Sequence, residues 1–165
     1  MAAPQPGPAM PGGAAARRLA VAVAGRAPVP AATIVRVVRA VVAGESARRG
    51  RRARAASRLT SVQVTFLLRP AMRRLNREWK GHDRATDVLS FALPGPGGDL
   101  LGDVYICPAV ARRQAREFGV SPREEVLRLV IHGALHLLGH DHPEGAGRTR
   151  GVMWRRQEGY VSRLA

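Results

Sequence analysis

Four of the five histidines of this chain lie in residues 132–142, which read HGALHLLGHDH. His132 and His136 are four positions apart, and on an α-helix this spacing places two side chains on one face, one turn apart. Gly139 lies where a helix can end through a left-handed residue, after which the chain can bring His142 back toward the other two. The spacing therefore predicts a metal site with three nitrogen ligands, His132, His136 and His142.

Three protein ligands are typical of a catalytic zinc site. A structural site is closed by four ligands, whereas a catalytic site keeps one position for water or substrate. Cys107 is the single cysteine, so a closed cysteine-rich cage is excluded, and we expect this residue to be a small buried hydrophobe at a strand end. The sequence predicts one Zn2+ per chain, although three imidazoles can also bind Ni2+, Cu2+ or Fe2+.

Two features bear on the third ligand and on the reaction. His140 competes with His142, because it would lie near the same face if the helix continued through Gly139. The spacing is also that of the metzincin proteases, in which a glutamate directly after the first histidine acts as general base. Gly133 occupies that position here. The pattern therefore favours metal-assisted hydrolysis of something other than a peptide.

Two further blocks accompany the histidines: residues 75–91 read LNREWKGHDRATDVLSF, and residues 101–106 read LGDVYI. Together the three ordered motifs, which fall between residues 59 and 160, resemble the bacterial YbeY family of rRNA-maturation endoribonucleases. The resemblance implies a zincin-like fold, similar to the catalytic domain of metalloproteases. It also implies a single-strand-specific metallo-endoribonuclease that matures the 3′ end of small-subunit (16S) rRNA, acts in ribosome quality control, has the ribosome and its small subunit as partners, and is cytoplasmic.

One position departs from the family pattern. The basic residue of the second block is an arginine in the family and is Lys80 here, the only lysine of the chain. Arginine grips a phosphate through two hydrogen bonds, whereas lysine offers a compact point charge. We expect Lys80 to act with the three histidines as a catalytic residue that neutralises charge on the phosphate. Arg77 or Arg84 could supply the missing guanidinium, or could be solvated surface charges.

The charge balance suits a polyanionic partner. The chain has 27 basic and 12 acidic residues and a formal net charge of +15, and cationic side chains release the counterions condensed on phosphates. An arginine-rich composition can also arise from coding bias alone. Aromatic residues make up 4% of the chain, so contact with the RNA backbone is expected rather than stacking on an aromatic platform.

Hydrophobic periodicity predicts an α+β fold, a small mixed sheet with helices packed around the central metal-bearing helix. Residues 1–18, rich in Pro, Gly and Ala, are expected to be disordered, and residues 19–165 to form a single metal-dependent endoribonuclease domain. The predicted strands are 19–24, 62–68, 86–91 and 101–106. The predicted helices are 30–42, 70–79, 108–118, 122–138 and 146–163, and residues 44–57 are predicted to be an arginine-rich loop or insertion.

Several roles stay open in the sequence. Candidates to orient the imidazoles are Asp103, Asp141 and Glu158, and candidates for proton transfer are Asp87, Ser90, His140 and Asp141. No apolar stretch approaches the roughly 20 residues that span a bilayer, so no membrane association is expected. The alternatives to an endoribonuclease are a zinc-stabilised, non-catalytic ribosome assembly factor and a metallopeptidase or amidohydrolase. The oligomeric state is not predicted.

Overall fold

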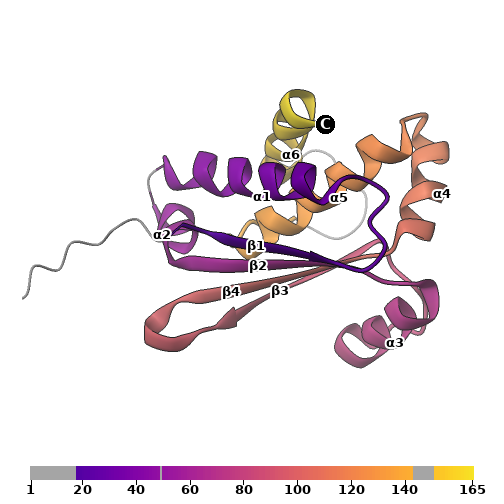
Figure 1. The fold of residues 1–165 in the computed structure, drawn as a ribbon, viewed down its shortest axis with the longest axis horizontal. Coiled ribbons are helices and arrows are strands. Elements are labelled where there is room, and N and C mark those ends of the chain that lie inside the picture. The colour runs from indigo at the N-terminus through magenta and orange to yellow at the C-terminus, as the bar shows by residue number, and fades with distance from the viewer. Residues whose placement is uncertain (1–17, 49, 143–150) are drawn as a thin grey trace, which may run out of the picture.

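A computed structural model describes residues 18–48, 50–142 and 151–165 (Figure 1). Its sheet has four strands in the order β1-β2-β4-β3. Strands β1, β2 and β4 are parallel, and β3 pairs antiparallel with β4 at one edge. The strands are β1 (Ala20–Ala24), β2 (Leu59–Phe66), β3 (Val88–Pro94) and β4 (Leu100–Ile106). The expected small mixed sheet is therefore confirmed.

Six α-helices surround this sheet in the described part of the chain. Helices α1, α5 and α6 lie on one side of the sheet and α3 on the other (Figure 1). Between β3 and β4 the chain forms a short 3-10 turn, Pro96–Gly98. The helices are α1 (Ala31–Ser46), α2 (Arg51–Arg58), α3 (Arg69–Lys80), α4 (Pro108–Phe118), α5 (Pro122–Leu137) and α6 (Val152–Leu164).

The main core lies between the sheet and helices α1 and α5. Strand β2 buries Val62, Val64 and Phe66 on this face, while Ser61 and Gln63 lie half-exposed on the other. This alternation is what a strand covered on one face requires. Helix α1 contributes apolar side chains at helical spacing to the same core: Ile34, Val37, Val38 and Val41.

Helix α5 is the central helix, and its first residues set where it begins. Ser121 caps it, accepting a hydrogen bond at Oγ from the backbone N–H of Glu124 at 3.0 Å, and Pro122 fits the first turn because its missing N–H needs no partner there. A methyl group added at Gly133 would lie 2.6 Å from Val104 Cγ1 of β4. The glycine therefore lets α5 approach the sheet closely, directly beside His132.

The arginine-rich segment was wrongly predicted as a loop. Helix α1 continues to Ser46, four residues beyond its predicted end, and residues 51–58 form helix α2. Alanine and arginine are strong helix formers, but this segment has too few apolar residues for a periodic pattern to be visible. The single buried side chain of α2 is Ala56.

Other boundaries shifted less. Leu68 was expected to continue the second strand, but it precedes α3 and is 80% exposed. Strand β3 begins at Val88 rather than at residue 86. The last helix begins at Val152; the first five residues of its predicted range, like nearly all of the N-terminal segment expected to be disordered, lie outside the described residues. Across the described helices, none combines the length and apolar character that crossing a bilayer requires.

Candidate metal centre

Three histidines meet at the C-terminal end of α5. His132 and His136 project from adjacent turns, and their Nε2 atoms lie 3.1 Å apart. Gly139 follows the helix with a φ of 79°, and its N–H donates to the carbonyl of His136 at 2.9 Å. This left-handed turn reverses the chain and brings His142 to the other two, so that one ligand atom from each imidazole lies within 4.8 Å of the others. His132 is buried, and His136 and His142 are half-buried.

The spacing of these nitrogens fits a small divalent ion. For Zn–N bonds of about 2.0–2.1 Å, two ligands of a tetrahedral ion lie about 3.3–3.4 Å apart, close to the observed 3.1 Å between His132 and His136. Two facing Nε2 atoms can share at most one hydrogen, whereas a cation between them satisfies both lone pairs. The donor set therefore suits one metal ion held by three imidazoles.

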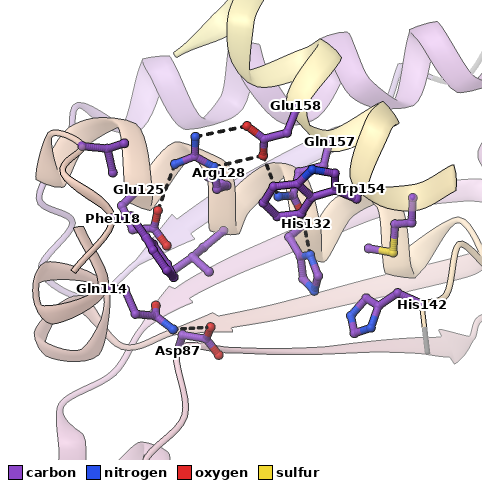
Figure 2. Close-up of a pocket in the computed structure, with 13 residues that line it drawn as sticks. Asp87, Gln114, Phe118, Glu125, Arg128, His132, His142, Trp154, Gln157 and Glu158 are labelled. Atoms are coloured by element: carbon purple, nitrogen blue, oxygen red, sulfur yellow. Dashed lines mark hydrogen bonds and ion pairs between the residues drawn. The ribbon is translucent and has the colours of Figure 1, made fainter. Parts of the chain in front are cut away.

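His132 is oriented by a chain of hydrogen bonds from α6 (Figure 2). Its Nδ1 lies 2.7 Å from Gln157 Oε1, and Gln157 Nε2 donates to Glu158 Oε1 at 3.0 Å. Because the amide nitrogen is turned to Glu158, the amide oxygen faces His132 and accepts from Nδ1–H. This tautomer leaves the Nε2 lone pair of His132 directed at the other histidines.

The sequence did not single out Gln157 for this role. Of the three carboxylates considered, Glu158 does not contact His132 directly. It accepts a hydrogen bond from the Gln157 amide, which in turn contacts His132. Asp141 instead accepts from the backbone N–H of His142 at 2.8 Å, and Asp103 accepts from the Tyr105 hydroxyl at 3.4 Å. A glutamine on a helix 25 residues away carries no signal of its own in a single sequence.

His140 points away from the centre and is buried against α1. Its Nε2 lies 2.8 Å from Glu45 Oε2, and Glu45 also accepts from Tyr160 at 3.0 Å and from Arg156 at 3.0 Å. Burial alone would raise the pKa of Glu45, but the hydrogen bonds from His140 and Tyr160 and the Arg156 guanidinium outweigh it, so the pKa is lowered. Burial lowers the pKa of His140, against the pull of Glu45. Between the two candidates for the third position, the structure brings His142 to the cluster.

A cavity of about 390 Å³ opens beside His132 and His142. Figure 2 shows Asp87 and Gln114 on one side of it and the aromatic rings of Phe118 and Trp154 nearby. Asp87 Oδ2 accepts from Gln114 Nε2 at 2.9 Å, and Gln114 Oε1 is buried without a hydrogen-bond partner among the described atoms. The remaining lining residues are Val120, Glu125, Arg128, Leu129, Met153, Gln157 and Glu158.

Carboxylates gather around Arg128 in the wall of this cavity (Figure 2). Arg128 binds Glu124 at 2.8 Å, Glu125 at 3.0 Å and Glu158 at 3.1 Å, which satisfies a half-buried guanidinium through its several donors. Burial raises the pKa of Glu125, and the nearby charges of Asp87 and Glu158 raise it further, against the effect of Arg128. The network fixes α5 to α6 and so holds Gln157 in position behind His132.

Lys80 lies apart from the residues that line the cavity. It is the last residue of α3, and its side chain is exposed. Gly81 follows in the left-handed conformation, with a φ of 71°, and ends the helix. Of the four residues considered for proton transfer, Asp87 lines the cavity of the histidines. Cys107 is fully buried between β4 and α4, as expected.

The sequence model of the family described as Endoribonuclease YbeY matches residues 27–165. The chain belongs to the YbeY family. The match includes α5, His142 and Lys80, so the three motifs and their elements lie inside the family region.

Relatives and a solved structure agree with this assignment. The chain is 49% identical over 84 residues to Endoribonuclease YbeY of Sulfurihydrogenibium sp., covering 49% of this chain and 55% of that protein. It is 50% identical over 95 residues to Endoribonuclease YbeY of Solibacter usitatus, covering 56% of this chain and 63% of that protein. The matched region therefore spans less than two thirds of either relative. The solution structure of TM1509 from Thermotoga maritima is similar over 87% of this chain and 88% of that one, with a TM-score of 0.54 and 26% identity.

Proposed function

We propose that this protein is a metal-dependent endoribonuclease that cleaves phosphodiester bonds of single-stranded rRNA. The observation that carries the proposal is the convergence of His132, His136 and His142 beside an open cavity. Membership of the YbeY family gives the substrate class, since the relatives are named as endoribonucleases. The 3′ end of small-subunit rRNA is the proposed substrate region, with the ribosome and its small subunit as partners in processing and quality control, in the cytoplasm.

The three histidines are the proposed ligands of one Zn2+ per chain. Bound there, Zn2+ would act as a Lewis acid that lowers the pKa of water toward about 7 and so would supply a nucleophile at neutral pH. The zincin-like assignment of the fold is part of the same proposal. It is supported by a metal helix packed on a mixed sheet, with the third ligand delivered by a glycine turn.

The chain's own residues supply orientation and proton transfer. Gln157 holds the Nδ1–H of His132, which keeps the Nε2 lone pair directed at the centre. Asp87 is the proposed proton acceptor, because its carboxylate lines the cavity. Thr86, Val88 and Gln114 donate to that carboxylate and so fix its orientation in the wall of the cavity.

Lys80 is the proposed contact to the phosphate, in the position of the family arginine. Its exposed side chain at the end of α3 is long and flexible, and a compact ammonium can follow a mobile phosphate without the fixed geometry of a guanidinium. Lys80→Arg should preserve or raise the rate of RNA cleavage, and Lys80→Ala should lower it with the metal retained. Normal cleavage by the alanine variant would remove Lys80 from the reaction.

The proposal is tested with a labelled single-stranded RNA that spans the small-subunit 3′ end. Wild type should cleave it, and folded His136→Ala should lose cleavage. Equal cleavage by both would indicate a contaminating nuclease and favour the non-catalytic assembly factor, whose metal loss would appear as unfolding. Hydrolysis of casein without hydrolysis of RNA would indicate a peptidase, a reading that Gly133 disfavours because no base follows His132.

A further inference from the structure

A second site is formed between α3, the loop that follows it, and α4. This groove has a volume of about 960 Å³. Six of its nine lining residues are arginine and one is acidic, so among the described residues its charge is strongly positive. The lining residues are Arg69, Pro70, Arg73, Arg74, Arg77, Asp83, Arg84, Ala85 and Arg113.

Asp83 organises part of the groove without neutralising it. Arg73 donates to both carboxylate oxygens, from Nε at 2.9 Å and from Nη2 at 2.5 Å, and Arg77 Nη1 lies 3.7 Å from Asp83 Oδ1. The guanidinium beside it lowers the pKa of Asp83, which therefore stays ionised. One carboxylate thus orients two guanidinium groups and leaves the net charge of the groove positive.

The arginines on α3 are arranged in a way that disfavours the helix. Arg69, Arg73 and Arg77 follow one another at four-residue spacing, and like charges at this spacing destabilise a helix. Arg69, Arg74 and Arg84 make no ion pair with a described residue. A stripe of guanidinium groups matches the repeat of negative charges along a nucleic-acid backbone, because each group can bind phosphate oxygens through two hydrogen bonds.

Two segments of the chain contribute residues both to the groove and to the cavity beside the histidines. Arg113 in the groove is followed directly by Gln114 in the cavity wall, and Ala85 in the groove precedes the cavity residue Asp87 by two positions. The 2.9 Å hydrogen bond from Gln114 to Asp87 joins these two segments. The two sites therefore lie near one another, on segments of the chain that they share.

We propose that this groove is a binding site for the phosphates of an RNA single strand, a few nucleotides from the bond that is cleaved. The inference rests on the proposed function for the identity of the strand. In this proposal the arginine groove binds the RNA backbone, and the histidine cavity holds the phosphodiester that is cleaved. Lys80 and the metal ligands take no part in the groove.

The test uses two variants of the full chain that lose the same charge. The groove variant is Arg69→Gln, Arg74→Gln and Arg84→Gln, which leaves the Arg73–Asp83 pair intact. The control variant replaces three exposed arginines of α1 and α2 instead, Arg36→Gln, Arg51→Gln and Arg54→Gln. Figure 1 shows α2 at the opposite end of the sheet from α3.

Binding of a labelled single-stranded RNA is measured over a series of salt concentrations, with a chelator present to prevent cleavage. Each phosphate contact contributes about 0.7 to the slope of log K against log salt for a single strand. The groove variant should lose about 2 from this slope if its three arginines each bind a phosphate, and the control variant should change it by much less. Equal slopes for the two variants would overturn the proposal, because the charge would then act only as a diffuse field.

Cleavage of two substrates separates this proposal from the proposed function. In the groove variant, kcat/KM should fall for an RNA long enough to reach the groove and stay unchanged for a short oligonucleotide that fills only the cavity. Cleavage of both lengths by wild type, with no effect of the groove variant, would refute the groove and leave the function standing. Strong binding of RNA by wild type without cleavage of either substrate would refute the proposed function and leave the groove standing. Competition by polyglutamate as effective as competition by RNA would overturn the assignment to RNA.

Discussion

Gly133 decides how closely the metal helix approaches the sheet, and replacing it with alanine tests that packing. The added Cβ would lie 2.6 Å from Val104 Cγ1 and 3.2 Å from Val104 Cγ2. Val104 is 1% exposed in the middle of β4, so its side chain is enclosed by the core and cannot turn out toward solvent. Either α5 or β4 must shift, and the shift falls on the residue next to His132.

Two opposing terms set the size of the effect. Alanine is better than glycine in a helix by roughly 0.8–1.0 kcal/mol, while forcing an extra methyl group into a packed core costs roughly 1–3 kcal/mol. Gly159 provides a matched control because it lies inside α6, where an added Cβ meets nothing within 4 Å. Gly159→Ala should raise the free energy of unfolding by up to about 1 kcal/mol, and Gly133→Ala should be less stable than this control by roughly 1–3 kcal/mol.

Thermal and urea denaturation of the metal-free proteins would measure this difference. For a domain of this size each kcal/mol corresponds to a change in Tm of about 2–4 °C. The double variant Gly133→Ala with Val104→Ala removes the two clashing methyl groups and leaves the Val104 Cβ at 3.5 Å. Its destabilisation should be smaller than the sum of the two single effects by at least about 0.5 kcal/mol. Equal stability of Gly133→Ala and Gly159→Ala, or strict additivity in the double variant, would refute the packing argument.

Three further outcomes follow from individual hydrogen bonds. Gln157→Leu removes the acceptor for Nδ1–H of His132, so metal affinity in a competition titration should fall by roughly 10- to 100-fold, with the fold retained; an unchanged affinity would exclude Gln157 from orienting the ligand. Because the pKa of Glu45 is lowered in the folded protein, its contribution to stability is present above its ordinary value of 4.5 and is lost as the pH falls through the lower folded value. Glu45→Gln should therefore flatten the fall in unfolding free energy below that pH, measured by denaturation at a series of pH values, and an unchanged profile would contradict the lowered pKa. Ser121→Ala should cost about 1 kcal/mol through loss of the N-cap of α5, and Ser121→Asp should restore it in the same assay; no loss on truncation would mean that the cap adds nothing.

Local patterns predicted the parts of this fold that depend on neighbouring residues. The alternation of Val62, Val64 and Phe66 predicted β2, and the Ser121 and Gly139 signals predicted the start and the end of the metal helix. Helix α2 was missed because a short helix with one buried alanine has no hydrophobic period. Two sources stabilise α2. One is the local helix propensity of its alanines and arginines, and the other is tertiary contact with α1.

For the site, the sequence predicted the cluster of three histidines because their spacing is local. It favoured His142 over His140 because Gly139 can end the helix, but it did not predict the partner of His140, which is Glu45, a buried carboxylate 95 residues away on α1. Gln157 was not predicted for the same reason. Its contact with His132 depends on the packing of α6 against α5, to which the hydrogen bonds between Arg128 and Glu158 contribute. Partners fixed by packing between distant helices leave no periodic trace in one sequence.

The central claim is that three named imidazoles hold one metal ion, and metal content by mass spectrometry after purification and dialysis tests it most directly. Wild type should carry about one ion per chain, and His132→Ala, His136→Ala and His142→Ala should each lose most of it. His82→Ala, at an exposed position outside the cluster, and His140→Gln, which keeps a donor toward Glu45, should both retain it. A metal content that is unchanged in the three cluster variants, or that falls equally in the two controls, would contradict the account.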